Sequence, residues 1–146
     1  MLIDERVFTF EYDGKIWRLE LWKGNYNTDI GLGGGEIGLY YKDKNSNSSF
    51  YNSVGENDML NMSMTIRTKN NICFIVSEKN TWWLTGFQLF NPYVSGELIM
   101  DAKIIFKTAE MRNAFKSEFN SMNADEKRGV TISDNGETGI NLTWAY

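Results

Sequence analysis

The chain has 146 residues, 42% of them apolar and 14% aromatic, which suits a single domain and favours β-sheet. Its 15 basic and 19 acidic residues leave a formal charge of −4, so we expect no nucleic acid partner, because nucleic acid binding needs clustered lysine and arginine. With no histidine and one cysteine, Cys73, the chain cannot form a Ser-His-Asp triad, a Cys-His pair or an internal disulfide, and we expect no metal site and no cofactor.

Residues 8–21 predict a β-hairpin with one buried face. Apolar residues alternate with polar ones from Phe8 to Tyr12 and again from Trp17 to Leu21. Between these two runs stands Asp13-Gly14, the strongest short-range signal for a two-residue hairpin turn.

A glycine-rich segment comes next. Residues 24–35 hold five glycines, counting both ends, and predict a loop. Residues 36–42 predict a strand. Residues 43–58 are rich in asparagine and serine, and they predict an exposed loop.

Four more strands are predicted in the middle of the chain. Residues 60–67 alternate cleanly between apolar and polar side chains, and residues 98–106 do so again. Short apolar runs at 72–77 and 82–89 predict the other two strands. The only proline, Pro92, falls in the loop that follows them.

The hydrophobic period then changes to that of a helix. Apolar residues from Met111 to Met122 recur at the spacing of one helical face. Thr108 can cap this helix, and Glu110 places negative charge in its first turn, where it is favourable. We expect a helix at about residues 109–123 whose methionine and phenylalanine stripe packs on the core.

A closing hairpin ends the chain, because residues 130–133 and 139–144 flank the turn signal Asp134-Asn135-Gly136. The predicted fold class is mainly β (α+β). It consists of an antiparallel sheet, sandwich or barrel-like, of about eight or nine strands with the C-terminal amphipathic helix packed on it. Residues 1–146 form one domain in this prediction.

Gly33, Gly35 and Gly38 match the pattern G-x-G-x-x-G. A dinucleotide site needs a helix to open on that pattern, and the following Leu39-Tyr40-Tyr41 predicts a strand instead. A flexible loop entering a strand is therefore favoured over a nucleotide site.

The predicted corner between strand and glycine loop carries Trp22, Lys23 and Tyr26. Rigid aromatic side chains at such corners suit ligand contact, although Trp22 could equally pack while Lys23 points to water. Glu36 stands between small neighbours. With Lys23 it could bind a polar group or act as acid or base, or it could be a surface carboxylate or part of a structural ion pair.

Adjacent Trp82 and Trp83 point to opposite faces of their predicted strand, and Thr85 shares the face of Trp83. This pattern predicts either an aromatic cleft for a sugar or another flat ligand, or plain packing. Tyr40 shares strand parity with Glu36. The candidate ligand-binding residues are Trp22, Lys23, Tyr26, Glu36, Tyr40, Trp82, Trp83 and Thr85, and the catalytic candidates are Glu36 and Lys23.

Three blocks occur in an order that resembles a known family. They are Trp17-Arg18-Leu19-Glu20-Leu21-Trp22-Lys23-Gly24-x-Tyr26, Gly35-Glu36-Ile37-Gly38-x-Tyr40 and Trp82-Trp83-Leu84-Thr85-Gly86-Phe87, with Met111 and Phe115 following in the helix. Across about residues 6–120 the chain resembles domain of unknown function 4474, a family of mostly Gram-positive bacterial sequences. The resemblance implies no activity. It implies that most of the candidates above are motif positions, but Asn27 and Gly35 replace a glycine and an alanine of the family pattern.

These observations favour a binding module with an aromatic, glycine-rich cleft for an unknown small molecule, glycan, lipid headgroup or protein. One alternative is an enzyme or toxin-like effector domain that uses Glu36 and Lys23 on a cell-envelope or nucleotide substrate. Glycoside hydrolysis would need a second carboxylate, for which Glu20 and Asp29 are nearest in sequence. A further alternative is an inhibitor or immunity-type protein partner.

The location of the protein is predicted from what the sequence lacks. Residues 1–6 have neither the basic start nor the apolar stretch of a signal peptide. No run approaches the roughly 18 apolar residues of a membrane helix. We therefore expect no transmembrane segment, and a place in the cytoplasm or export without a conventional signal peptide.

Overall fold

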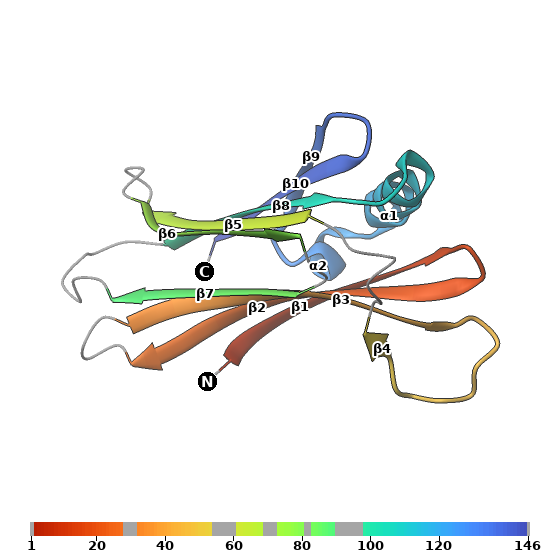
Figure 1. Cartoon of the computed structure of the whole chain (residues 1–146), viewed down its shortest axis with the longest axis horizontal. Coiled ribbons are helices and arrows are strands. Elements are labelled where there is room, and N and C mark those ends of the chain that lie inside the picture. Colours follow the sequence, from red (N-terminus) through yellow and green to blue (C-terminus); the bar gives the residue numbers. More distant parts are fainter. Residues whose placement is uncertain are drawn as a thin grey trace.

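A computed structural model describes residues 2–27, 32–53, 61–68, 73–80, 83–89 and 98–145, with side chains described in 6–21, 37–52, 61–64 and 99–145. In this part of the chain, two five-stranded antiparallel sheets lie face to face, and a helix covers one end of the space between them (Figure 1). The prediction of a mainly β fold with one late amphipathic helix is confirmed, in its sandwich form.

The first sheet is built on the two long N-terminal hairpins. Its order is β1-β2-β3, with both β4 and β7 paired to β3. Its strands are β1 (Leu2–Tyr12), β2 (Lys15–Asn27), β3 (Leu32–Asp43), β4 (Asn52–Ser53) and β7 (Trp83–Leu89).

The second sheet has the order β6-β5-β8-β10-β9 and includes the closing hairpin. Its strands are β5 (Asn61–Thr68), β6 (Cys73–Asn80), β8 (Leu98–Ile105), β9 (Thr131–Asn135) and β10 (Gly139–Ala145).

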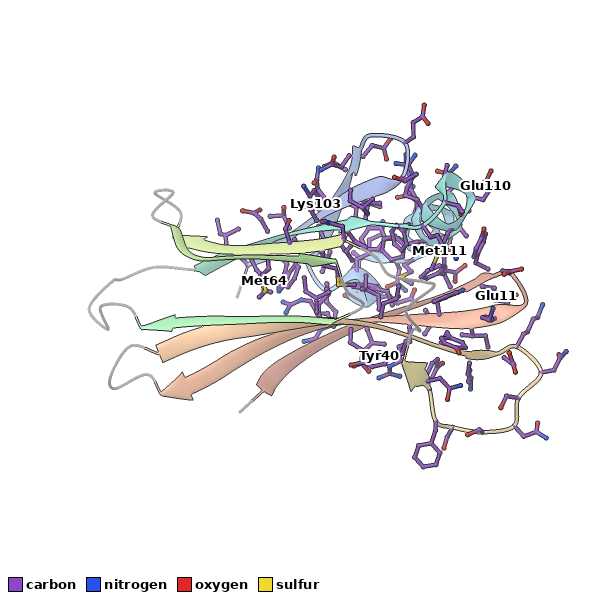
Figure 2. All side chains as sticks on the ribbon, viewed as in Figure 1. Glu11, Tyr40, Met64, Lys103, Glu110 and Met111 are labelled. Atoms are coloured by element: carbon purple, nitrogen blue, oxygen red, sulfur yellow. The ribbon has the colours of Figure 1, made fainter. Side chains whose placement is uncertain are left out.

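The core lies between the two sheets, where the inward positions of both meet. Trp17, Leu19 and Leu21 of β2 are buried, and so are Met64 and Met100 of the second sheet. Figure 2 shows Met64 within the space between the layers, whereas Lys103 lies on the outer side of the second sheet. The alternation predicted from the sequence therefore identifies the buried faces correctly.

The helix α1 (Ala109–Ser121) closes the end of this core, and a one-turn helix α2 (Ala124–Lys127) follows it. Thr108 caps α1, because its side chain accepts a hydrogen bond from the backbone N–H of Met111. Phe115 packs edge-on against Phe10 of β1, with ring centroids 5.5 Å apart. The predicted cap and apolar stripe are confirmed.

Both turn predictions are also confirmed. Asp13 and Gly14 have φ angles of 54° and 68°, the left-handed conformation that a tight hairpin turn requires. Gly136 adopts a φ of 67° between β9 and β10.

The prediction of a loop at residues 24–35 is wrong at both of its ends. β2 continues to Asn27 and β3 begins at Leu32, so only residues 28–31 fall outside the described strands. The glycines of β3 have strand neighbours on both sides, since Gly34 pairs with Gly24 of β2 and with Phe87 of β7. Ladder hydrogen bonds use the backbone alone, which explains how a segment with few side chains extends the sheet.

The loop predicted at 43–58 contains the two-residue strand β4, which pairs with Tyr40 and Tyr41. The strand predicted at 72–77 runs further, because β6 ends at Asn80. Trp82 and Pro92 lie outside the described residues.

Candidate functional site

The register of the first sheet aligns three of the predicted site residues in one row across three strands. Trp22 of β2 pairs with Glu36 of β3, and Glu36 pairs with Thr85 of β7. The neighbouring row, Leu21 and Ile37, belongs to the buried core. Because successive residues of a strand alternate between faces, the register of the Trp22 row alternates with that of the buried Leu21 and Ile37.

Two more predicted residues share this outer register. Trp83 pairs with Gly38, which is two positions from Glu36 in β3, and Tyr40 is two positions further on. Five of the candidates from the sequence therefore share the same register parity within one sheet. Figure 2 shows the side chain of Tyr40 on the outer side of the first sheet.

Lys23 and Tyr26 stand apart from this row. Lys23 pairs with Gly35, so its register alternates with that of Glu36. Tyr26 falls at the irregularity between Asn25 and Asn27, where the pairing with β3 shifts. The partner of Glu36 across the hairpin is thus Trp22 and not Lys23.

A groove occupies the part of this face whose side chains are described. Arg18 donates from Nε to Oε1 of Glu20 over 2.7 Å, which joins two neighbours along β2. The Arg18 guanidinium also lies 5.6 Å from the ring centroid of Tyr51, and the Lys42 ammonium lies 5.0 Å from it. The groove is lined by Arg18, Glu20, Tyr40, Ser49, Phe50 and Tyr51.

Gly38 determines how Tyr40 lies on the sheet. A Cβ atom added at Gly38 would stand 2.7 Å from Cε2 and from the hydroxyl oxygen of Tyr40. The ring therefore covers the backbone of Gly38, in space that any side chain at position 38 would take. The last glycine of the G-x-G-x-x-G pattern serves this contact. β3 runs on through this pattern to Asp43, so a strand follows the glycines, as the interpretation against a nucleotide site predicts.

Comparison with known proteins identifies the family. The model of the family described as Domain of unknown function (DUF4474) matches residues 1–141. The chain belongs to this family. The resemblance inferred from the three sequence blocks is confirmed. No curated protein matches the chain, and no solved structure matches it either.

The groove adds residues to the DUF4474 candidate site that sequence reasoning missed. Arg18 and Glu20 share the outer parity with Trp22, so the alternation of β2 already contained this signal. Phe50 and Tyr51 come from the segment predicted to be an exposed loop, and no periodic pattern singles them out. Phe50 is 82% exposed, the highest exposure among large apolar side chains in the described ranges.

In the described part of this DUF4474 chain, no group of three or more acidic, cysteine or histidine side chains could hold a metal ion. No helix in the same residues is long and apolar enough to cross a membrane.

Proposed function

We propose that the outer face of the first sheet, formed by β2, β3 and β7, is a glycan-binding surface. The observation that carries this proposal is the cross-strand row of Trp22, Glu36 and Thr85. An aromatic residue, a carboxylate and a hydroxyl on adjacent strands are the groups that recognise a sugar ring and its hydroxyls. Aromatic rings supply flat apolar area at low entropic cost, and carboxylates accept hydrogen bonds from hydroxyls.

The adjoining groove extends this surface with similar chemistry. Tyr40 and Tyr51 provide rings, while Arg18 and Glu20 provide a donor and an acceptor that already orient each other at 2.7 Å. Arginine and carboxylate charges cancel there, which suits an uncharged ligand better than a phosphate chain. A sheet face is also extended, so several sugar units could lie along the strands.

One observation favours a second function, glycoside hydrolysis on the same face. Glu20 pairs with Gly38, and the next outer position of β3 is Glu36, so the two glutamates stand at diagonal positions of an antiparallel pair. Diagonal neighbours are about 7–8 Å apart, and the distance between their Cβ atoms is somewhat shorter. Glycosidases hold their paired carboxyl groups about 5–10 Å apart, so this spacing is compatible with an acid–base pair.

Titration with soluble oligosaccharides tests the binding proposal. We expect saturable binding of at least one member of a panel of chitin, cellulose and peptidoglycan fragments, measured by calorimetry. Trp22→Ala and Tyr40→Ala should each weaken binding about tenfold, the effect of one lost stacking contact. Glu118→Gln on α1 changes one exposed carboxylate away from this face and should leave binding unchanged.

The same panel separates binding from hydrolysis. If the glutamate pair is catalytic, wild type will shorten the bound oligosaccharide, and Glu36→Gln and Glu20→Gln will bind it without cleavage. Binding with no product in wild type would reject hydrolysis. Absence of binding to the whole panel by a folded wild-type protein would reject both.

A further inference from the structure

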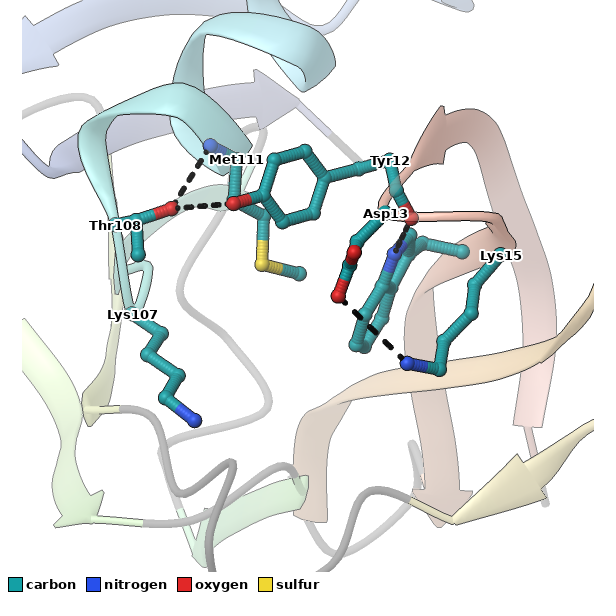
Figure 3. A pocket seen from close by; sticks show the side chains of 7 residues that line it. Tyr12, Asp13, Lys15, Lys107, Thr108 and Met111 are labelled. Carbon is teal, nitrogen blue, oxygen red and sulfur yellow. Dashed lines mark hydrogen bonds and ion pairs between the residues drawn. The ribbon is translucent and has the colours of Figure 1, made fainter.

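A second, separate pocket lies at the end of the sandwich, between the β1–β2 turn and the first turn of α1 (Figure 3). Its volume is about 190 Å³. Drug-sized ligands occupy pockets of roughly 300–1,000 Å³, so this pocket matches a molecule with one ring. Trp17, on the inner face of β2, lines this pocket, whereas the proposed glycan surface is the outer face of that strand.

Each neutral polar side chain at the floor of the pocket has a hydrogen-bond partner. The indole N–H of Trp17 donates to the carbonyl oxygen of Tyr12 over 3.0 Å. The hydroxyl groups of Tyr12 and Thr108 are 3.0 Å apart, and Thr108 Oγ1 accepts from the backbone N–H of Met111 (Figure 3). The pocket is also lined by the Tyr12 phenol, the Met111 thioether and the Trp17 indole, which is 5% exposed and packs against the rings of Phe10 and Tyr41. Such a surface suits an aromatic ring.

The charged side chains at the rim of the pocket are two lysines and one aspartate. Lys107 and Lys15 border the pocket from two sides, and Asp13 lies beside Lys15 with 3.9 Å between Nζ and Oδ2 (Figure 3). A lysine ammonium has three donors, so it can accept a further anionic partner in addition to a contact that it already has.

We propose that this pocket binds a small aromatic carboxylate. Its ring would lie against Trp17 and Met111, and its carboxylate would lie at the rim between Lys15 and Lys107. We expect a ligand to need both an aromatic ring and a negative charge. The apolar floor offers no partner for a charge, and an anion that contacts only the lysines would form a solvent-exposed ion pair, which contributes little.

A titration series on the wild-type protein tests the two requirements separately. The probes are benzoate, benzamide and acetate, followed by two-dimensional ¹H–¹⁵N NMR of the Trp17 indole and the Met111 backbone amide. We expect benzoate to shift both signals saturably, with a dissociation constant on the order of 1 mM for so small a ligand. Benzamide keeps the ring but not the charge and should bind at least fivefold more weakly. Acetate keeps only the charge and should not saturate.

Matched lysine variants locate the charge. Lys107→Gln should weaken benzoate binding about threefold to tenfold. Lys103→Gln removes the same charge from β8, where the side chain lines a groove on the other sheet, and should leave binding unchanged. Equal binding of benzamide and benzoate, equal effects of the two lysine variants, or no saturable shift of the Trp17 and Met111 signals would each overturn the proposal. None of these outcomes bears on oligosaccharide binding, which the Tyr40 and Trp22 variants test.

Discussion

Arg112 of α1 donates a hydrogen bond from Nη1 to the carbonyl oxygen of Gly139, the first residue of β10, over 2.9 Å. The same nitrogen lies 3.2 Å from the carbonyl oxygen of Gly136, and the Arg112 side chain is buried. One helical side chain therefore satisfies two carbonyl groups of the closing hairpin and connects that hairpin to the helix that covers the core.

Arg112→Met should lower the free energy of unfolding by about 2–3 kcal/mol, because it leaves the Gly136 and Gly139 carbonyl groups without their charged donor. Urea denaturation followed by circular dichroism measures this change. Lys116→Met on the same helix removes an exposed contact to Asp134 and should cost only a small fraction of that amount. Equal losses in the two variants would contradict the connecting role of Arg112.

Gly139→Ala should destabilise the domain by about 1–3 kcal/mol through overpacking at the start of β10. A Cβ atom there would collide with the backbone carbonyl oxygen of Asn135 and come within 2.7 Å of the Ile105 side chain. A backbone atom of the paired strand cannot turn away as a side chain can. Thermal denaturation measures the loss, and an unchanged melting temperature would show that the hairpin accommodates a methyl group.

Gly38→Ala, unlike Gly139→Ala, should cost little stability but should clearly weaken glycan binding. Its Cβ atom would meet only the far end of the Tyr40 side chain, which is half-buried and can swing outward. The change in unfolding free energy should stay below about 1 kcal/mol, since alanine also restricts the unfolded chain. Oligosaccharide affinity should fall several-fold because the Tyr40 ring is displaced. Thr131→Ala, an exposed change on β9 of the second sheet, is the control, and full affinity in Gly38→Ala would remove Tyr40 from the binding surface.

The hydrogen bond from Lys116 lowers the pKa of the Asp134 carboxyl below its ordinary value, and the nearby Lys116 and Arg112 charges act in the same direction. A carboxyl with a lowered folded-state pKa stabilises the fold above its unfolded pKa, and that contribution is lost as the pH falls through the folded value. We therefore expect carboxyl NMR to show an Asp134 pKa below that of an ordinary aspartate, and this pKa to rise in Lys116→Met. An unchanged Asp134 midpoint in that variant would show that the hydrogen bond is absent in solution.

Local features of this sequence were sufficient to predict the closing turns of two hairpins, the helix and the buried faces of several strands. Asp13-Gly14 and Gly136 mark the two turns because left-handed backbone conformations favour glycine and aspartate. The spacing from Met111 to Met122 identifies the helix and its buried face, since a helix brings residues three and four apart to one side. Alternation along β2 likewise separates the buried Leu19 from its outer neighbours.

Partners across strands and between layers were decided only by the tertiary structure. Periodicity states which face a residue takes but not which residue stands opposite, so the pairing of Glu36 with Trp22 in place of Lys23 required the observed register. The glycines of residues 32–35 form strand because β2 and β7 pair with them on both sides, which no local propensity encodes. Tyr12 and Thr108 meet at the end pocket although 96 positions separate them. The sequence by itself thus determined the faces and turns, and the long-range pairing of sheets and helix determined the two candidate sites.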